Sequence, residues 1–469
     1  MRLTGNKGLY INRNLTIPFV FEGKQYTGFE GDTIASALIA NDELILSRSF
    51  KYHRPRGVLT MSGHDANSLI QIADEPNARA DRYEITPGLK AEPQNIYGSL
   101  KKDRARVLNY FSRFLPVGFY YKAFFWPKGI WNYWDILIRN LTGLGKVDTS
   151  VKPYDSDKQY KFCDIAIIGA GPAGLAAAIE AGNAGAETIL VDDNKLLGGS
   201  LNYARFDADR ASIQDMREQM IGQVEQNKNI TVYGNSVCTG WFADNFLTVM
   251  CESRMLKIRA RHVIVATGMF EQPIVFRNND LPGVMMCSAI QRLINLFGVS
   301  PGSKALIATT SSDGYATALD LIEAGIEVAA IVDFRKTRDE SGYINECNRQ
   351  NITIYQNYYV DEVISGKGKN YISSVKIKTL DDKDQKDESI NIDCDFIGMS
   401  GGYSPAGQLI CHTGGTLKYD KNLETFKVEM SRDNEHSSIA GSLNNHTKLD
   451  DVISDGKYAA YCSCLLYTS

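Results

Sequence analysis

A strand, a glycine-rich turn and a helix follow one another between residues 161 and 193, and this order constrains the fold more than any other feature of the chain. The stretch KFCDIAIIGAGPAGLAAAIEAGNAGAETILVDD holds an apolar run, the spacing Gly169-x-Gly171-x-x-Gly174, an Ala-rich helical segment and a second apolar run that ends in Asp192. The acid lies at the distance expected in a dinucleotide-binding βαβ unit. The motif therefore predicts an α/β, Rossmann-type domain.

The three glycines and the acid have different tasks in such a site. Gly169 permits a tight turn, Gly171 lets a pyrophosphate approach the backbone, and Gly174 lets helix and strand pack closely. The helix that starts at Pro172 offers free N–H groups to the phosphates. Asp192 is expected to accept hydrogen bonds from the ribose hydroxyls, and its charge disfavours a 2′-phosphate. NAD or FAD is therefore favoured over NADP, and these residues leave the choice between NAD and FAD open.

Further segments extend the predicted dinucleotide site. A Gly-Gly-Ser loop follows the second strand, ITVYGNSV is typical of a strand that meets the adenine, and ARHVIVATGMFEQP ends a strand in Ala-Thr-Gly. SSIAGSLNNHT is similar to the closing motif of glutathione-reductase-like domains. The candidate positions in these segments are Gly199, Ser200, Val237, Ala266, Thr267, Gly268, Ala440 and Gly441. Together with the glycine turn they predict a glutathione-reductase-like fold with two dinucleotide-binding domains.

A second βαβ unit spans residues 304–335, but its turn, TTSSDGY, retains only Gly314. Without small residues at the positions of close approach, a pyrophosphate is hard to seat. We therefore expect a Rossmann-like domain that holds no nicotinamide cofactor. The chain also lacks the CxxC or CxxxxC pair of disulfide reductases, so thiol–disulfide chemistry is not expected.

The first 95 residues predict a small β-grasp domain of the ferredoxin-like 2Fe–2S type. A hairpin and an amphipathic helix, TIASALIAND, precede a basic loop, RSFKYHRPRG, at the position where plant-type ferredoxins carry cluster-binding cysteines. The first 162 residues contain no cysteine, so the domain is expected to lack the cluster. Arg54 and Arg56, on either side of Pro55, are candidates to grip the pyrophosphate of NAD or the phosphate of a flavin. The alternative is a solvated charged turn.

Residues 96–158 hold three of the four tryptophans and many Phe and Tyr. Such a segment is expected either to pack between domains or to form an interface with another protein of a complex. No run of roughly 20 apolar residues and no signal peptide is seen, so a cytoplasmic protein without a membrane partner is expected. The net charge of −4 argues against a nucleic-acid partner. No metal site is predicted from the scattered cysteines.

The predicted domains follow from these segments. They are a cluster-less β-grasp domain at 1–95, an aromatic-rich helical connection at 96–158, a dinucleotide-binding domain at 159–285 and 396–461, an inserted degenerate Rossmann-like domain at 286–395, and an expected non-native tail at 462–469.

The order of GDTIASALIAND, SRSFKYHRPRG, FLPVGFYYKAFFWP, IIGAGPAGLAAA, TTSSDGYATALDL and GGYSP resembles the α subunits of heterotetrameric sarcosine oxidases. The resemblance implies a complex with β, γ and δ subunits that oxidises sarcosine to glycine. The implied products are hydrogen peroxide and either formaldehyde or methylene-tetrahydrofolate, so the complex would belong to one-carbon metabolism. The resemblance also implies FAD and covalent FMN on the β subunit, with FMN at the interface between the α and β subunits, and NAD held noncovalently by the α subunit.

By this resemblance the NAD site includes Ala173, Asp192, Asp193, Asn194, Ser200, Val237, Ala440 and Thr447. No general base or nucleophile for sarcosine oxidation is identifiable, so no catalytic residue is assigned. In the family a tetrahydrofolate-binding domain follows the Rossmann region, where this chain ends in CLLYTS. We expect the chain to be a fragment, since a transposon end used in library preparation would encode those six residues.

Two other functions are compatible with these residues. One is the α subunit of a related amine, opine or hydroxyproline dehydrogenase, although several of those use cluster cysteines that are absent here. The other is a noncatalytic NAD-binding scaffold.

Overall fold

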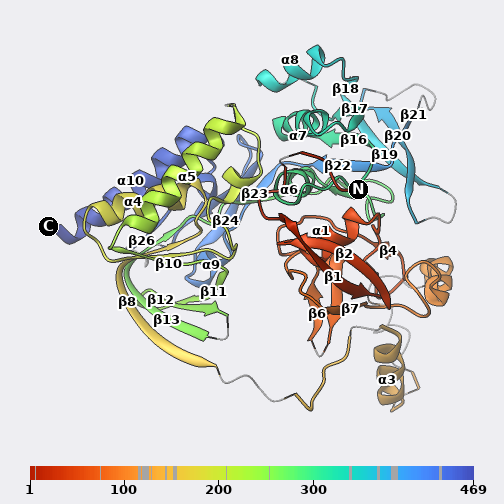
Figure 1. The fold of residues 1–469 in the computed structure, drawn as a ribbon, viewed down its shortest axis with the longest axis horizontal. Helices are drawn as coiled ribbons and strands as arrows, with labels where there is room; N and C mark the ends of the chain where they lie inside the picture. Colours follow the sequence, from red (N-terminus) through yellow and green to blue (C-terminus); the bar gives the residue numbers. More distant parts are fainter. Residues whose placement is uncertain are drawn as a thin grey trace. The chain divides into compact units, whose positions relative to one another are not determined.

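The computed structural model describes residues 1–5, 7–73, 75–114, 118, 126–127, 129–142, 145–151, 156–207, 209–252, 254–336, 341–366, 370–381, 389–431 and 436–468. The chain forms two units, each built from two stretches of sequence. One unit comprises Met1–Val151 and Pro273–Gly402, and the other comprises Lys152–Gln272 and Tyr403–Ser469. Figure 1 identifies their elements.

The unit of residues 152–272 and 403–469 is built on one seven-stranded sheet in the order β10-β9-β8-β13-β12-β11, with β26 also paired to β13. Strands β8, β9, β10, β13 and β26 run parallel, while β11, β12 and β13 form an antiparallel meander. The bounds are β8 Asp157–Ile168, β9 Thr188–Val191, β10 Ile230–Tyr233, β11 Ser236–Phe242, β12 Phe246–Cys251, β13 Arg254–Val265 and β26 Ser437–Ile439.

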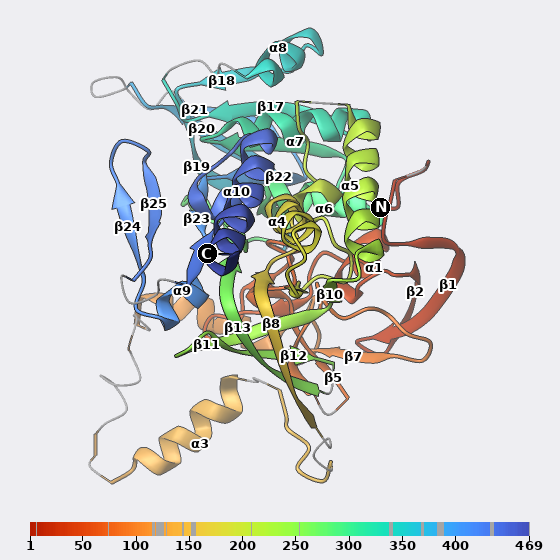
Figure 2. The same ribbon diagram turned by 90° about the vertical axis from the view of Figure 1, so that its left-hand side faces the viewer.

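Helices α4 (Pro172–Asn183), α5 (Arg210–Gln226) and α10 (Leu449–Thr468) lie together on one face of this sheet (Figures 1 and 2). Successive side chains of a strand point to opposite faces, so β8 serves two cores. Ile165 and Ile167 pack among the helices, whereas Ala166 and Ile168 pack with Trp241 and the meander. The apolar run predicted as a buried strand is therefore covered on both faces, as a parallel sheet requires.

Smaller elements complete this unit. They are η3 Gly199–Asn202, β14 Met269–Glu271, β23 Tyr403–Pro405, α9 Gln408–His412, η4 Gly441–Asn444 and the hairpin of β24 Thr416–Asp420 and β25 Thr425–Glu429. The hairpin is visible in blue in Figure 2.

The N-terminal part of the other unit is a five-stranded sheet in the order β2-β1-β7-β5-β6, which confirms the β-grasp prediction. Its strands are β1 Asn12–Phe21, β2 Lys24–Glu30, β5 Leu69–Ile72, β6 Glu75–Arg79 and β7 Lys90–Pro93, and its helices are α1 Ile34–Ala40 and η1 Ala66–Ser68. Helix α1 begins with a capping box, because Thr33 and Ser36 satisfy each other's backbone N–H groups. The basic loop lies between β3 Ser47–Arg48 and β4 Pro55–Arg56, which pair with each other.

The second part of this unit is a parallel sheet in the order β15-β22-β16-β17-β18, which confirms the Rossmann-like prediction. The strands are β15 Val284–Met286, β16 Lys304–Thr309, β17 Glu327–Asp333, β18 Ile354–Gln356 and β22 Phe396–Ser400. The helices are α6 Cys287–Phe297, α7 Ser312–Glu323 and α8 Gly342–Arg349. An antiparallel sheet is formed by β19 Tyr358–Ser365, β20 Ile372–Thr379 and β21 Ser389–Asp393. Strand β15 begins before residue 286 and β22 begins after residue 395, and both lie in the parallel sheet. The sheet therefore reaches beyond the bounds 286–395 predicted for the Rossmann-like domain.

The aromatic-rich segment contains the 3₁₀ helix η2 (Arg104–Phe114) and helix α3 (Trp131–Thr142), while residues 115–117, 119–125 and 128 lie outside the described part of the chain. On η2 no residue is buried, and Tyr110 and Phe114 are each 76% exposed. Trp131 and Tyr133 of α3 are exposed as well. These aromatics do not form a core of the chain, so the predicted interface with another protein stays as a proposal.

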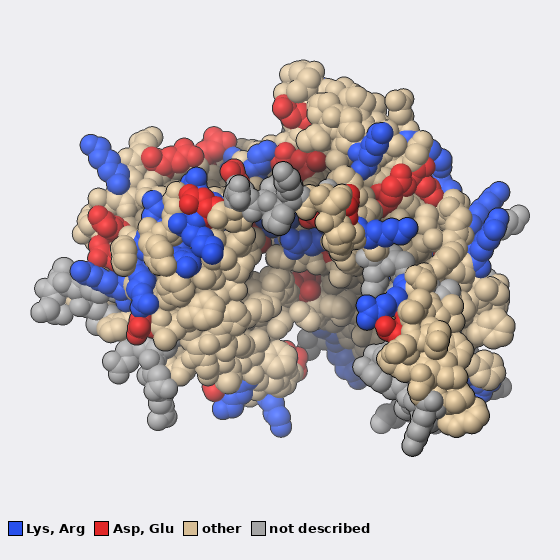
Figure 3. All heavy atoms as spheres, turned by 90° about the horizontal axis from the view of Figure 1, so that it is seen from below, with Lys and Arg blue, Asp and Glu red and all other residues tan. Residues whose placement is uncertain are grey.

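Charged side chains of both signs are present on the face shown in Figure 3. Within the described residues, no helix combines the length and the apolar composition that a membrane crossing would demand.

Candidate functional site

The predicted glycine turn closes the end of β8 and opens α4. Gly169 has φ +103°, and a Cβ there would lie 2.4 Å from the carbonyl oxygen of Ala266. A Cβ on Gly174 would lie 1.8 Å from the carbonyl oxygen of Gly169. By contrast, no described atom lies within 4 Å of a Cβ built on Gly171. The glycines therefore have the three tasks that their spacing predicts: a turn, an open face and close packing.

The first turn of α4 is open to an anion. Gly171 is the N-cap and has no side chain to accept a hydrogen bond, and Pro172 follows at the first helical position. The N–H groups of Ala173 and Gly174 therefore lack a capping side chain. Together with the positive end of the helix dipole they provide the donors that a phosphate group needs.

Asp192 braces the glycine turn from the end of β9. One of its carboxylate oxygens accepts a hydrogen bond from the Ala170 N–H at 2.5 Å, and the other accepts one from the Asn194 N–H at 2.8 Å. The residue is only 7% exposed, and burial raises the pKa of its carboxyl group. Each oxygen of Asp192 therefore has a protein partner, and its neighbour Asp193 is more exposed. Asp193 is half-buried and accepts a hydrogen bond from the Asn194 side chain at 3.0 Å.

The Gly-Gly-Ser loop lies directly against the glycine turn. The Gly198 N–H donates to the Ala170 carbonyl at 2.8 Å, and a Cβ on Gly199 would lie 2.8 Å from Gly171 Cα. This contact brings Gly199 against the glycine turn, with Ser200 next to it in the chain, and their role in binding a dinucleotide stays a prediction. Arg217 stabilises the segment that follows this loop, because its guanidinium group donates a hydrogen bond to the Asn202 side chain at 3.1 Å.

The Ala-Thr-Gly segment and the closing motif also meet at the start of α4. Ala266 donates its N–H to the Ile168 carbonyl, and Thr267 Oγ1 donates to the Ala406 carbonyl at 2.9 Å; Gly268 follows with φ +73°. A Cβ on Gly441 would lie 2.4 Å from Ala173 Cβ, so Ala440 and Gly441 pack onto the first turn of the helix.

Two further predicted positions lie at the edges of this constellation. Val237 lies in β11 next to Ser236, whose N–H donates to the Asp192 carbonyl. Thr447 is exposed in the turn before α10, and among the described residues no hydrogen bond joins it to the glycine turn. The sequence reasoning missed Asp455, which accepts a hydrogen bond from the Gly441 N–H at 2.8 Å.

The corresponding acid of the second Rossmann-like sheet is paired with protein side chains. Asp333, at the end of β17, is fully buried and accepts hydrogen bonds from the Tyr315 hydroxyl at 2.8 Å and from the Arg335 guanidinium. Gly314 remains because a Cβ there would lie 2.4 Å from Thr309 Cβ. The acid at the end of β17 is thus engaged by protein groups, and the absence of a nicotinamide cofactor from this domain stays a prediction.

The basic loop is paired with acids that are distant in sequence. Arg48 is buried and donates to the Leu100 carbonyl, and buried His53 shares a hydrogen bond of 2.7 Å between its Nδ1 and Asp103 Oδ2. Arg54 Nη2 lies 2.6 Å from Asp280 Oδ1, and Arg56 is ion-paired with the same carboxylate. Nothing in the local sequence pointed to Asp103 or Asp280, because each comes from a separate segment.

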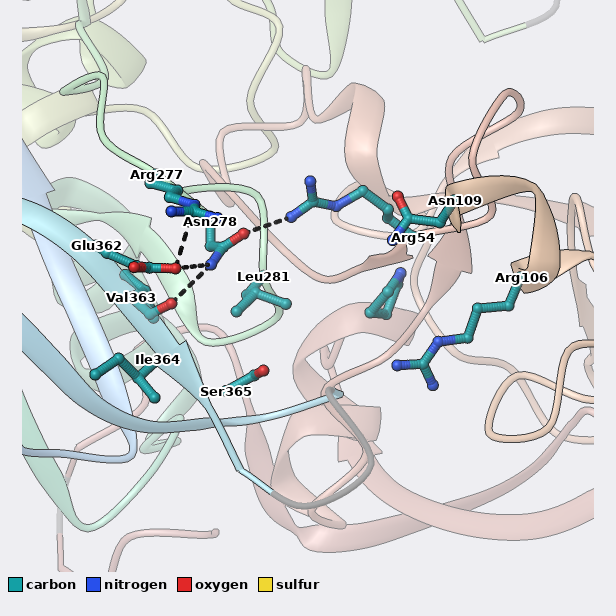
Figure 4. Close-up of a pocket in the computed structure, with 11 residues that line it drawn as sticks. Arg54, Arg106, Asn109, Arg277, Asn278, Leu281, Glu362, Val363, Ile364 and Ser365 are labelled. Carbon is teal, nitrogen blue, oxygen red and sulfur yellow. Dashed lines mark hydrogen bonds and ion pairs between the residues drawn. The ribbon is translucent and has the colours of Figure 1, made fainter. Parts of the chain in front are cut away.

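Arg54 also lines a pocket of about 380 Å³ in the unit of residues 1–151 and 273–402. In Figure 4, Arg54 and Arg106 lie on one side of this pocket, and Arg277, Asn278 and Glu362 on the other. The polar lining is completed by Asn109 and Ser365, and the apolar lining comprises Pro55, Leu281, Val363 and Ile364. Arg106, Arg277 and Asn278 were not identified from the sequence.

Two family models match the chain. One is described as "2Fe-2S iron-sulfur cluster binding domain" and matches residues 14–96, and the other as "Pyridine nucleotide-disulphide oxidoreductase" and matches residues 163–301. The first range contains no cysteine, so its residues do not fit a thiolate-bound cluster. Among the described residues, no group of three or more His, Cys, Asp or Glu side chains could hold a metal ion.

Curated relatives include α subunits of sarcosine oxidases. The protein of Rhizobium meliloti (strain 1021) is 36% identical over 430 residues, which are 86% of this chain and 41% of the relative. That of Corynebacterium sp. (strain U-96) is 27% identical and is matched by 96% of this chain, over 43% of its own length. One subunit of the opine oxidase of Agrobacterium tumefaciens (strain Ach5) is 30% identical over 37% of this chain and 37% of its own length. The chain thus spans less than half the length of the sarcosine oxidase relatives.

Among solved structures, L-proline dehydrogenase from P. horikoshii is similar with a TM-score of 0.68 at 19% identity, over 100% of this chain and 76% of that one. Thioredoxin reductase of T. acidophilum has a TM-score of 0.51 at 16% identity, over 66% of this chain and 100% of that one. These likenesses and the family models confirm the predicted fold class. The curated relatives confirm the predicted resemblance.

Proposed function

Since this chain is a relative of sarcosine oxidase α subunits, we propose that it serves as the α subunit of a sarcosine-oxidising complex and binds NAD in the site at Gly171. The observation that carries the NAD site is the open face of Gly171 beside the uncapped N-terminus of α4. A pyrophosphate that approaches there meets backbone N–H groups and no side chain. The turn after β16 retains only Gly314 of the glycine pattern, which supports the first Rossmann-type sheet as the place for the dinucleotide.

The residues of this chain bind and orient the dinucleotide. The first turn of α4 receives the pyrophosphate, Asp193 accepts hydrogen bonds from the ribose, and Gly199 and Gly441 border the phosphates. A carboxylate at the ribose disfavours a 2′-phosphate, so NAD is expected to bind more tightly than NADP. In this proposal, bound NAD would serve as a fixed dinucleotide rather than as a hydride acceptor.

Oxidation of the amine would then take place on a partner. We propose FAD and covalent FMN on the β subunit, with FMN at its boundary with this chain, and further γ and δ subunits. Tetrahydrofolate would bind a domain beyond these 469 residues. The exposed aromatics of η2 and α3 fit an interface within such a complex, since aromatic side chains anchor protein–protein contacts.

The NAD site is tested by Gly171→Ala. A Cβ there meets no described protein atom but occupies the face that the pyrophosphate would approach, so folding is expected to be normal and retained NAD to fall at least about tenfold. NAD released from the denatured, purified protein is quantified by chromatography. Gly222→Ala, in helix α5, is the control, because the nearest atom that its Cβ would meet is the side-chain nitrogen of Gln226 at 4.0 Å. Equal NAD in the wild type and both variants would contradict the proposal.

The oxidase role is tested by coexpression of the full chain with a flavin-binding sarcosine oxidase β subunit, together with the small subunits. Sarcosine-dependent hydrogen peroxide is the expected product. Peroxide formed from an opine and not from sarcosine would favour the opine oxidase alternative. NAD binding with no stable complex would favour the noncatalytic scaffold.

A further inference from the structure

Three arginines from separate segments line the pocket shown in Figure 4. Arg54 comes from the basic loop, Arg106 from η2, and Arg277 from the segment before β15. The volume of about 380 Å³ lies within the range of small-ligand sites. All lining residues belong to the unit of residues 1–151 and 273–402, whereas the proposed NAD site belongs to the other unit. The pocket therefore needs an explanation of its own.

The charges around the pocket do not balance. Arg54 and Arg56 share the single carboxylate of Asp280. Arg277 is paired with Glu362, at 3.3 Å between Nε and Oε1. Arg106 forms no ion pair with a carboxylate in the described part of the chain. Four guanidinium groups thus meet two carboxylates, which leaves an excess of two positive charges.

Arg106 contributes one of these uncompensated charges. It is half-buried, and its side chain makes a long hydrogen bond of 3.4 Å to the Asn370 side chain. Burial lowers the pKa of nearby Arg48, and the positive charge of Arg106 lowers it further. A partly buried cation that is repelled by another cation is costly unless an anion compensates it.

Arg54 also retains donors for a ligand. Its contacts with Asp280 and Asn278 both use Nη2, so Nη1 and Nε have no hydrogen-bond partner among the residues that the structure describes. The buried side chains of Pro55, Leu281 and Val363 provide apolar walls. Such walls lower the local dielectric constant and strengthen each charge–charge interaction.

We propose that this pocket binds a phosphate group as a dianion, held by the guanidinium groups of Arg54, Arg106 and Arg277. A phosphate monoester carries close to two negative charges at neutral pH, which matches the excess around the pocket. Its oxygens can accept paired hydrogen bonds from several planar guanidinium groups, whereas a single carboxylate has only two oxygens to share among the three arginines. Asn109 and Ser365 add polar groups at the wall of the pocket.

The test is titration calorimetry of the full chain with inorganic phosphate at constant ionic strength. Saturating NAD is present, so that the proposed dinucleotide site is filled. We expect saturable binding of phosphate to the wild type. Arg106→Gln is expected to weaken this binding about tenfold, because one charge-assisted hydrogen bond is lost. Arg106→Lys keeps the positive charge but loses the planar guanidinium group, so its affinity for phosphate is expected to lie between those of the wild type and Arg106→Gln. Arg104→Gln is the matched control, because Arg104 is exposed on the same helix and does not line the pocket.

Thermal unfolding of each variant establishes that it is folded. Phosphate binding that is equally tight in Arg106→Gln, Arg104→Gln and the wild type would overturn the proposal. The same holds if titration with chloride gives the same heat of binding as titration with phosphate. The source of the phosphate is distinguished with FMN and riboflavin. Tighter binding of FMN than of inorganic phosphate indicates a phosphorylated cofactor, and equal binding indicates the free anion. Riboflavin binding as tight as FMN binding would refute phosphate recognition. A failure of NAD binding leaves this outcome unchanged, because the two sites share no residue.

Discussion

At the scale of single residues, two adjacent aspartates have different surroundings. Asp192 is buried and both its oxygens accept hydrogen bonds from the protein, while Asp193 is more exposed. A buried N–H that loses its acceptor costs the full free energy of desolvation. Asp192 therefore braces the glycine turn, and we propose that Asp193 binds the ligand.

We predict that Asp192→Ala and Asp193→Ala separate stability from affinity. Asp192→Ala leaves the Ala170 and Asn194 N–H groups without their acceptor, so the free energy of unfolding should fall by about 2–3 kcal/mol. Asp193→Ala should change the free energy of unfolding by no more than about 0.5 kcal/mol and weaken the binding of NAD about tenfold. Denaturant unfolding and NAD titration measure the two effects. The reverse pattern would return the ribose contact to Asp192.

His262 predicts a pH dependence of stability. Burial, and to a smaller extent the charge of His436, lowers the pKa of this histidine to about 4. The unfolded chain, with a pKa near 6.5, binds more protons between pH 4 and 6.5, so stability rises with pH across that window and is lost as pH falls. The change is about 3 kcal/mol. His262→Gln, which can still hydrogen-bond Ser438, should flatten this dependence in unfolding measured at pH 4.5 and 7.

At the scale of elements, helix α1 depends on its cap. It has only seven residues, too few to be stable by propensity alone. Thr33 accepts a hydrogen bond from the Ser36 N–H at 3.2 Å, and the Ser36 hydroxyl accepts one from the Thr33 N–H at 3.0 Å. The same Ser36 hydroxyl donates to buried Asp32, so the cap is tied to the core of the β-grasp fold.

Replacement of the cap should destabilise this domain measurably. Thr33→Ala is expected to lower the free energy of unfolding by about 1 kcal/mol, because one N–H of the first turn loses its acceptor. Thr86→Ala is the comparison, since Thr86 is an exposed threonine outside any helix cap. Urea unfolding of both variants decides the matter: an equal effect would mean that the cap does not stabilise the helix.

At the scale of the whole molecule, ion pairs join segments that lie far apart in the sequence. Arg56 reaches Asp280, which is 224 residues away, and Arg54 reaches the same carboxylate. Asn278 strengthens the junction by accepting from Arg54 and donating to the Val363 carbonyl. These contacts link the basic loop to the second Rossmann-like part of its unit.

Asp280→Asn should loosen this junction. Two guanidinium groups lose their carboxylate, so we expect faster amide hydrogen exchange in residues 49–57 and a free energy of unfolding lower by about 1–2 kcal/mol. Asp381→Asn is the control, because its ion pair with Lys336 is largely exposed and should contribute little. Exchange that is unchanged in residues 49–57 would show that the loop is held by its other contacts.

The sequence by itself determined the βαβ units, the β-grasp start and the glycine turn. These depend on local periodicity and on backbone positions where only glycine fits, such as Gly169 and Gly174. It also excluded a cysteine-bound cluster in the β-grasp domain, because ligands that are absent from that range cannot be supplied by its folding.

Only the tertiary structure decided which acids meet the basic loop, that Tyr315 engages Asp333, and that Arg106 and Arg277 join Arg54 around one pocket. Each of these contacts depends on how separate elements pack, and most join residues tens to hundreds of positions apart. A charge that is isolated in the sequence can be paired in the fold, because its partner is chosen by how sheets and loops pack rather than by spacing along the chain.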